Sequence, residues 1–192
     1  RDKHRKTSLR LLAPIDNYQM SLLGSRQNGF LKELYPERSS FTLPFIQAQE
    51  LQGAWSAYAE GQHLNVLGFK MHPFYGTYVP TRTVHLELFG TWLSSYSGLR
   101  SNAIDIGTGC GVLAFMLGRK DFQRIVASDS NPNAIESVKR DLQRQDSRYP
   151  IIPLHSDLFD NIQGSFDVIV FNPPWIQGVP RSLVEEALYF EP

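Results

Sequence analysis

AIDIGTGCGVLAFML, residues 103–117, joins a short apolar strand to a glycine-rich turn and then to the start of an apolar helix. Glycine adopts positive φ without strain, so such a turn bends sharply and lets a ligand lie against its backbone. The same alternation continues downstream, with strand patterns at 124–128, 151–154 and 166–171 and a helix pattern at 132–144. Strands that alternate with helices form parallel sheets. We therefore predict an α/β fold built on a parallel sheet.

Asn172-Pro173-Pro174-Trp175 ends the last of these strands. Proline has no backbone N–H to donate to a sheet, so two prolines in a row must terminate the strand. In open α/β sheets, ligands bind at the carboxyl ends of the strands. An amide oxygen and a backbone carbonyl there can accept both hydrogens of a planar –NH2 group, and an indole can stack on its plane. The motif is therefore typical of a site that holds a nitrogen atom for alkylation.

Three aspartates accompany the predicted strand ends. Asp105 precedes the glycine loop, where a carboxylate repels a pyrophosphate and attracts a cationic ligand. Asp129 ends the second strand, 24 positions later, where it can accept hydrogen bonds from both ribose hydroxyls. Asp157 follows the third strand and can accept from an adenine amine. Together they favour a nucleoside that carries a sulfonium and no phosphate.

Plainer interpretations of these residues stay open. The glycine loop is also compatible with a tight turn between strand and helix. Asp129 is compatible with an N-cap of the helix that begins at Pro132, and Asp157 with an ordinary loop carboxylate. Val112 occupies the position where the dinucleotide fingerprint G-x-G-x-x-G requires glycine, which disfavours a nucleotide-dependent oxidoreductase.

Composition bounds the class of protein. The chain has 192 residues, of which 42% are hydrophobic and 20% charged, as in an ordinary soluble globular protein. Its formal net charge is zero, which gives no support to nucleic-acid binding driven by global charge. The single cysteine, Cys110, excludes an internal disulfide and fits a reducing, cytoplasmic setting. No apolar run has the length of a membrane span, so no membrane partner is expected.

The N-terminal third has a different pattern. Residues 1–8, RDKHRKTS, are basic and polar, and we interpret them as a mobile tail, with an RNA-contacting arm as the alternative. Over residues 9–60, leucines near the start and a stretch at 48–58 favour short helices that prolines interrupt. We therefore predict a small, mainly helical appendage over residues 1–63 and a second domain over residues 64–192.

The second domain opens with a lead-in before the glycine loop. Strand patterns cover residues 66–71 and 76–79, on either side of a turn. Residues 81–96 then predict a helix, which Thr81 or Thr83 can cap. The apolar face predicted for this helix consists of Val84, Leu86, Leu88, Phe89, Trp92 and Leu93.

DIGTGCG, SDSNP, SDLF and NPPW, in this order and spacing, resemble the motifs of class I S-adenosylmethionine-dependent methyltransferases. The chain is most similar to the branch with an asparagine-proline-proline-aromatic motif. That branch includes glutamine methyltransferases of translation release factors, adenine-amine methyltransferases of DNA and tRNA, and guanine-amine methyltransferases of ribosomal RNA. The resemblance is specific over residues 101–176. It implies a Rossmann-like, doubly wound parallel sheet in which the fourth strand lies beside the first.

The later strands of that fold are missing from this chain, whose last stretch at 181–190 offers at most a helix. The fourth strand is then an exposed apolar edge, which is an aggregation hazard. We therefore expect a C-terminally truncated fragment, or a second chain that supplies the remainder.

The resemblance also implies a role for individual residues. The methionine part of S-adenosyl-L-methionine would be held by Asp105, Gly107, Thr108 and Gly109, the ribose by Asp129, Ser130 and Asn131, and the adenine by Asp157 and Leu158. The acceptor side would consist of the catalytic residues Asn172, Pro173, Pro174 and Trp175. Tyr78, Pro80 and Thr81 could close over the cofactor but are not among the predicted site residues, and no metal is implied.

The expected activity is methyl transfer from S-adenosyl-L-methionine to an amine or amide nitrogen of a nucleic-acid base or a protein glutamine. The expected partner is a macromolecule, which can be RNA, DNA or protein, and a small-molecule acceptor stays open. The alternative is a non-catalytic cofactor-binding subunit, or a fragment of a larger methyltransferase complex. The identity of the acceptor and the oligomeric state do not follow from the sequence.

Overall fold

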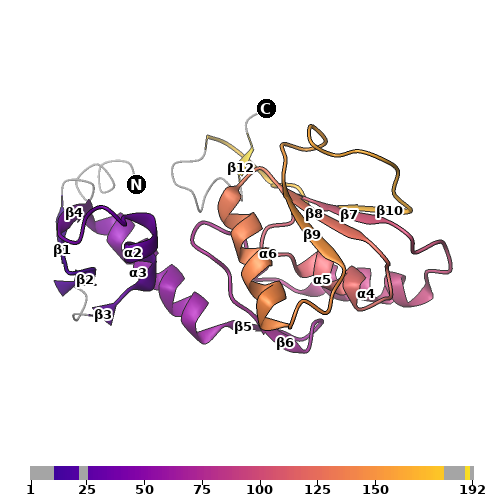
Figure 1. Ribbon diagram of the computed structural model, residues 1–192, viewed down its shortest axis with the longest axis horizontal. Coiled ribbons are helices and arrows are strands. Elements are labelled where there is room, and N and C mark those ends of the chain that lie inside the picture. The colour runs from indigo at the N-terminus through magenta and orange to yellow at the C-terminus, as the bar shows by residue number, and fades with distance from the viewer. Residues whose placement is uncertain (1–10, 22–25, 180–188, 191–192) are drawn as a thin grey trace. The chain divides into compact units, whose positions relative to one another are not determined.

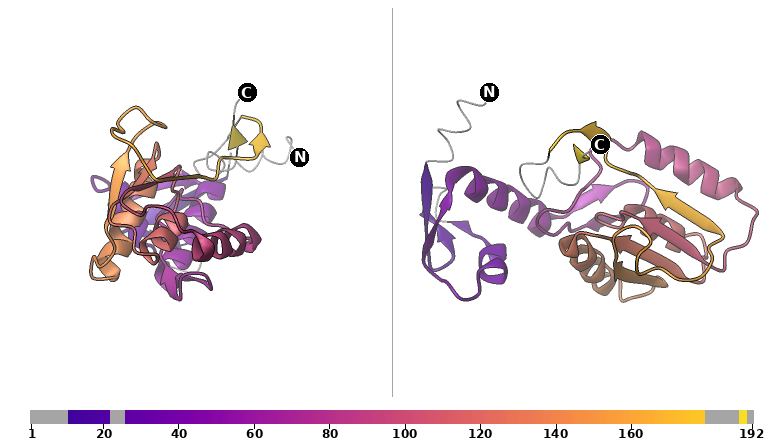
Figure 2. Two further views of the ribbon diagram at one scale, coloured as in Figure 1. Left: turned by 90° about the vertical axis from the view of Figure 1, so that its right-hand side faces the viewer. Right: turned by 90° about the horizontal axis from the view of Figure 1, so that it is seen from above.

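The computed structural model describes residues 11–21, 26–179 and 189–190, the last two and Arg26 by their backbone alone. The chain divides into two compact units between Glu60 and Gly61. Figures 1 and 2 show the course of the chain through both units. Each unit is described by itself.

In its described residues, the first unit combines a small antiparallel sheet with two helices. Its strand order is β3-β2-β1-β4. The elements are β1 (Leu12–Asp16), β2 (Gln19–Met20), β3 (Arg26–Gln27), α2 (Gly29–Leu34), β4 (Phe41–Pro44) and α3 (Phe45–Glu60). The side chain of Asn28 caps α2 by accepting from the backbone N–H of Phe30, and it donates to the carbonyl of Leu51 in α3 at 3.0 Å. This buried amide ties the two helices of the unit together.

The helical prediction for the first unit is right at one end and wrong at the other. The stretch at 48–58 lies within α3, as predicted. The segment around Leu11 and Leu12 forms strand β1 instead, because Ala13 and Ile15 are buried while their neighbours are exposed, which is the period of a strand. The other leucines behind the helical prediction, Leu9, Leu22 and Leu23, lie outside the described residues.

The second unit begins with the hairpin β5 (Gln62–Leu64) and β6 (Phe69–Met71), followed by α4 (Val84–Ser95). The strand predicted at 66–71 is therefore present only in its second half, because residues 65–68 form the turn, with Gly68 at φ 71°. The strand predicted at 76–79 is wrong. The backbone there is bound by the side chain of Asn131 and by the N–H of Cys110 in the glycine loop rather than by a neighbouring strand.

The predicted apolar face of α4 is only partly buried. Leu86 and Leu93 are fully covered, whereas Val84 and Leu88 are 66% and 67% exposed. Thr83 precedes the helix as its N-cap residue, but its hydroxyl bonds to Glu87 Oε1 at 3.0 Å and makes no cap hydrogen bond to the backbone.

The central sheet carries the alternation that the sequence predicts. Its strands β7 (Ala103–Ile106), β8 (Ile125–Asp129), β9 (Ile151–His155) and β10 (Val168–Phe171) are parallel, in the order β10-β7-β8-β9. The connecting helices are α5 (Val112–Gly118) and α6 (Pro132–Arg144). The α/β class, the parallel sheet and the position of the fourth core strand beside the first are confirmed.

The two faces of this sheet are covered differently. The main core joins one face to apolar side chains of α4, α5 and α6, among them Leu86, Phe115 and Val138 (Figure 1). On the other face, a smaller apolar cluster surrounds Ile104. Partly buried side chains of the segment after β9, Ile162 and Phe166, pack against it. On that side Ile169 of β10 is 55% exposed.

Strand β10 lies at the margin of the sheet. Within the described residues its only strand neighbour is β7. After the Asn-Pro-Pro-Trp motif, β11 (Ile176–Gln177) pairs in parallel with β12 (Tyr189–Phe190) in a separate two-stranded sheet. The helix predicted at 181–190 falls mostly outside the described residues, and its last two positions form β12.

Candidate functional site

The glycine loop between β7 and α5 is held by backbone hydrogen bonds, one inside the loop from the N–H of Gly111 to the carbonyl of Thr108 at 2.8 Å and one to strand β8. The N–H of Thr108 donates to the carbonyl of Ser128 at 2.9 Å. Gly109 and Gly111 have φ of 55° and 90°, in the left-handed region that strains other residues. A Cβ on Gly109 would lie 3.2 Å from the carbonyl oxygen of Tyr78, and one on Gly111 would lie 2.8 Å from Val138. The loop therefore requires glycine for conformation and for space.

Asp105 holds this loop from behind. Its Oδ2 accepts from Thr108 Oγ1 at 2.6 Å and from the backbone N–H of Ala114, in the first turn of α5, at 3.0 Å. Its Oδ1 is buried and has no hydrogen-bond partner among the described residues. Burial raises the pKa of Asp105 to about 7. Asp105 and Thr108, predicted as cofactor ligands, thus lie beneath the loop and not on the wall of the cavity beside it.

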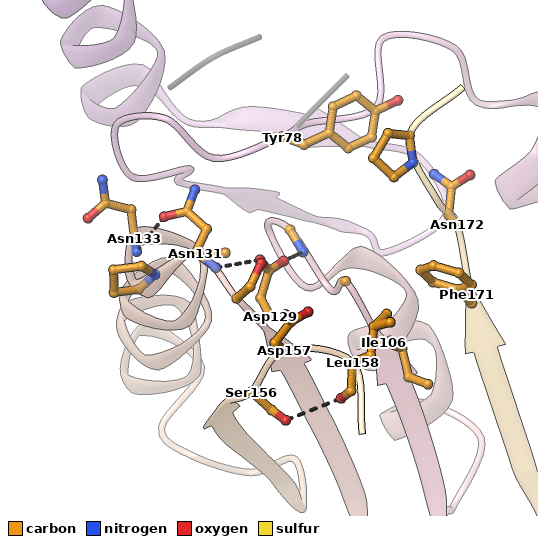
Figure 3. Close-up of a pocket in the computed structure, with 16 residues that line it drawn as sticks. Tyr78, Ile106, Asp129, Asn131, Asn133, Ser156, Asp157, Leu158, Phe171 and Asn172 are labelled. Atoms are coloured by element: carbon orange, nitrogen blue, oxygen red, sulfur yellow. Dashed lines mark hydrogen bonds between the residues drawn. The ribbon is translucent and has the colours of Figure 1, made fainter. Parts of the chain in front are cut away.

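That cavity opens at the carboxyl ends of the parallel strands and has a volume of about 530 Å³, within the usual range for a small-molecule site (Figure 3). Nine predicted site residues line it: Gly107, Gly109, Asp129, Ser130, Asn131, Asp157, Leu158, Asn172 and Pro174. The residues that line it without having been predicted are Tyr78, Ile106, Pro132, Asn133, Ala134, Ser156 and Phe171. The predicted Pro173 and Trp175 are not part of the lining.

Asp129 is bound at both carboxylate oxygens. Oδ2 accepts from the N–H of Gly109 and Oδ1 from the N–H of Asn131, each at 2.9 Å (Figure 3). Burial raises the pKa of Asp129, and the two backbone donors oppose that rise. The N-cap interpretation of Asp129 is wrong, because the cap of α6 is Asn131, whose side chain accepts from the N–H of Asn133.

Leu158 presents its side chain to the cavity from a strained backbone. Its φ is 43°, a conformation that a bulky side chain rarely adopts. The turn is held by Ser156, whose buried hydroxyl donates to the carbonyl of Leu158 at 3.2 Å and accepts from the N–H of Asn161 at 3.0 Å. Strain of this kind is found where a site needs a particular side chain in place.

Asn172 and Phe171 lie at one end of the cavity, and Asn131 and Asn133 lie at the other (Figure 3). The side chain of Asn172 is half-buried and has no hydrogen-bond partner within the described part of the chain. Trp175 is 68% exposed, and its ring lies 6.4 Å from that of His85, edge to face. The motif thus turns its amide into the cavity and its indole outwards.

The polar groups on the cavity wall define the ligand that it can hold. They comprise two carboxylates, three side-chain amides, hydroxyls and backbone groups, and no lysine or arginine is among the described residues that line it. Such a set suits a neutral or cationic ligand with hydroxyl and amine donors, and it lacks the cations that hold phosphate. The described residues contain no group of three or more possible metal ligands. No helix in the described ranges is long and apolar enough to span a membrane.

Several curated methyltransferases are similar to part of this chain. A putative protein N5-glutamine methyltransferase of Methanocaldococcus jannaschii is 32% identical over 89 residues, which cover 46% of this chain and 44% of that protein. The ribosomal protein uL3 glutamine methyltransferase of Neisseria meningitidis is 33% identical over 116 residues, or 58% of this chain and 38% of that protein. The ribosomal RNA small subunit methyltransferase C of Photorhabdus laumondii is 37% identical over 87 residues, which cover 45% of this chain and 25% of that protein.

Among solved structures, the T. thermophilus 16S rRNA N2 G1207 methyltransferase in complex with AdoMet and guanosine is similar, with a TM-score of 0.49 and 22% identity. The match covers 60% of this chain and 33% of that one. The chain spans less than half the length of each of the curated relatives named above. The methyltransferase small domain family matches residues 88–188, which is 101 of the 192 residues. Since this match includes the glycine loop and Asn172 to Trp175, the chain belongs to the methyltransferase small domain family.

Proposed function

We propose that this chain is the S-adenosyl-L-methionine-binding part of a methyltransferase that modifies an amine or amide nitrogen. The observation that carries the proposal is that one cavity contains the glycine loop, Asp129 and the free amide of Asn172. We name the part around Gly109, Asp129 and Leu158 the cofactor end, and the part around Phe171 and Asn172 the acceptor end. A methyl donor and a nitrogen acceptor must meet within one site for transfer, and this cavity has room for both.

The cofactor end fits an adenosine that bears a sulfonium. Asp129 and Asp157 supply carboxylate oxygens for ribose hydroxyls and an adenine amine, and Leu158 supplies an apolar surface for the base. Among the described residues of the cavity wall there is no lysine or arginine, which favours a ligand without phosphate. S-Adenosyl-L-methionine, when bound, supplies a methyl group on a positively charged sulfur.

The acceptor end positions the nitrogen that takes this methyl group. The Oδ1 atom of Asn172 can accept one N–H of the acceptor, and a backbone carbonyl of the prolines after it can accept the other, which keeps the nitrogen lone pair directed at the donor. In the transfer the S–CH3 bond breaks and the N–CH3 bond forms, with the electron pair returning to sulfur and the proton leaving nitrogen afterwards. Positioning supplies most of the rate enhancement, because the cavity wall offers no histidine and its carboxylates lie at the cofactor end.

We infer a macromolecular acceptor, either a protein glutamine or a base of a nucleic acid. The support is that the relatives are by name methyltransferases of protein glutamine, of a ribosomal protein or of ribosomal RNA. The proposed setting is the cytoplasm, where such acceptors occur.

Transfer of labelled methyl from S-adenosyl-L-methionine into separate RNA, DNA and protein fractions tests this proposal. Asn172→Ala should lower transfer by about 100-fold or more, the usual effect of removing one positioned polar group from a transfer site, and leave cofactor affinity within about twofold. Asn102→Ala is the matched control, since Asn102 is a half-buried asparagine at the opposite end of the same sheet. The site is misplaced if Asn172→Ala abolishes cofactor binding together with transfer.

A further inference from the structure

The segment 72–78, here called the strap, joins the β5–β6 hairpin to the cavity without forming a strand. One backbone group at every second strap residue is bound from outside. The four bonds are His72 N–H to Asp141 Oδ2 (2.9 Å), Phe74 N–H to Ser137 Oγ (3.1 Å), Asn131 Nδ2 to the Gly76 carbonyl (2.9 Å) and Cys110 N–H to the Tyr78 carbonyl (3.1 Å). Three of the outside groups are side chains of α6 or its cap, so α6 determines where the strap runs.

Asn131 is where the strap meets the cavity. Its backbone N–H donates to Asp129 Oδ1, its side-chain oxygen caps α6, and its side-chain NH2 donates to Gly76, each at 2.9 Å. The resemblance implies that Asn131 helps to hold ribose, but in this structure both ends of its amide are already bonded to the protein. Asn131 therefore links Asp129 to the strap.

Tyr78 ends the strap and lies over the glycine loop. Its carbonyl oxygen is so close to Gly109 that a Cβ there would approach it to 3.2 Å. The half-buried ring lines the cavity, and in the view of Figure 3 it lies between Asn131 and Asn172. The strap sets the position of this ring. The carbonyl of Tyr78 accepts from the N–H of Cys110 in the glycine loop, and the carbonyl of Gly76, two residues earlier, accepts from the side chain of Asn131.

We propose that Asn131 is a positioning residue that acts through the strap, holding Tyr78 as the wall that packs against the methyl donor. The inference rests on the proposed function. It adds a series of contacts that leads from Asn131, the cap of α6, through the strap and Tyr78 to the cofactor. Since the bond from Asn131 to Gly76 is remote from Asn172, its loss changes cofactor affinity and leaves transfer at saturating cofactor unchanged.

Asn131→Ser tests this, because serine keeps an oxygen that caps a helix and is too short to reach Gly76. We expect the dissociation constant for S-adenosyl-L-methionine, measured by calorimetry, to rise about fivefold to tenfold, as for the loss of one hydrogen bond. The kcat should stay within about twofold while the KM for cofactor rises. Asn131→Asp, which keeps the shape and the cap but cannot donate to Gly76, should behave alike.

Tyr78→Ala should weaken binding at least as much, and Tyr78→Phe should restore it, because the ring and not the hydroxyl forms the wall. If Asn131 acts through Tyr78, the double variant Asn131→Ser with Tyr78→Ala binds no more weakly than Tyr78→Ala alone. Tyr96→Ala, which removes another half-buried tyrosine outside the cavity, should bind as the unchanged protein does.

Additive losses in the double variant, or unchanged affinity in both Asn131 variants, would overturn this inference and leave the proposed function standing. An unchanged protein that binds no S-adenosyl-L-methionine would overturn both. Melting temperatures without cofactor separate a local effect from a general loss of fold, so affinities are compared at a temperature where every variant is folded.

Discussion

The two ends of the cavity are held in place by different means. At the cofactor end, Asp129 and Ser156 bond to backbone N–H groups of the surrounding loops, and Asp105 bonds to the N–H of Ala114 in the first turn of α5. At the acceptor end, the side chain of Asn172 makes no hydrogen bond to any described residue, and Trp175 is largely exposed. The difference indicates that the cofactor end is organised before any ligand arrives. In the proposed function, the amide of Asn172 is left free for the nitrogen of the incoming acceptor.

Removing the side chain of Asp129 should have the largest effect on the difference between the two ends. Asp129→Ala deletes the proposed acceptor of the ribose hydroxyls and leaves the N–H groups of Gly109 and Asn131 without their partner. We expect the dissociation constant for S-adenosyl-L-methionine to rise about 100-fold, as for two hydrogen bonds to a charged group. Calorimetry measures it, with the exposed Asp160→Ala as control. Normal binding by Asp129→Ala would show that the cofactor end is misassigned.

The dependence of stability on pH provides a second test, because burial raises the pKa of two carboxylates at the organised end, Asp105 and Asp129, besides that of Asp141 in α6. The pKa of Asp105 is about 7 in the folded protein against 3.8 for the free side chain, and burial raises the pKa of Asp129 as well. The folded state therefore holds more protons than the unfolded state between these values, and the free energy of unfolding falls as pH rises from about 4 to about 7.

Asp105→Asn removes the largest part of this effect. One proton contributes at most about 1.4 kcal/mol for each pH step of one, which is a tenfold change in the unfolding equilibrium. The free energy of unfolding, measured with urea at pH 5, 6 and 7, should decline less steeply with pH in this variant than in the unchanged protein. The variant Asp121→Asn, at an exposed position, should keep the original dependence on pH. An identical decline in Asp105→Asn would exclude Asp105 as the source.

Trp175 tests the acceptor end alone. Its ring is outside the cavity wall and contacts His85, so Trp175→Ala should leave cofactor affinity and melting temperature unchanged. If the exposed indole stacks on the acceptor, the KM for the acceptor should rise about fivefold to tenfold, as for the loss of one aromatic stack. Steady-state kinetics with the acceptor fraction that takes up label measures this. A change in cofactor affinity would mean that the two ends are not independent.

Substitutions at Leu158, also at the cofactor end, should have the smallest effect on cofactor affinity. Leu158→Gly relieves a backbone that costs about 1–3 kcal/mol and also removes an apolar surface from the cavity. We expect thermal stability to be equal or higher and cofactor affinity to fall about threefold. Leu158→Ala, which keeps the strain and loses the surface, is the matched variant. If both variants bind normally, the strained turn does not serve the cofactor.

The core of the fold is predictable because its signals are local. Residues 103–106, 132–144 and 151–154 carry apolar patterns whose period matches the element that forms. The strand wrongly predicted at 76–79 shows the limit. Its residues favour an extended backbone, but the partners of the backbone there are Asn131 and Cys110, far away in the chain. A pattern read along the sequence does not contain those partners.

The cavity wall shows the same limit at single residues. Asp129 and Asn172 can be predicted from the sequence, because their side-chain chemistry and their position at the end of a strand both indicate a ligand site. Ile106 and Ser156 line the cavity as well, but nothing in their chemistry distinguishes them from neighbours. In contrast, Thr108 has a suitable hydroxyl that Asp105 engages beneath the loop, which only the three-dimensional arrangement reveals.

The pairing of β10 with β7 has a consequence for how the protein comes into being on the ribosome. Ala103 pairs with Val168, while every other strand of this sheet, and every cofactor-end residue from Tyr78 to Leu158, lies earlier in the chain than β10. A parallel pairing across such a distance closes late, because a long loop must be ordered first. The residues of the cofactor end are therefore synthesised before Asn172, and the pairing that brings Asn172 to the cavity must wait until β10, the last strand of the parallel sheet in chain order, has been made.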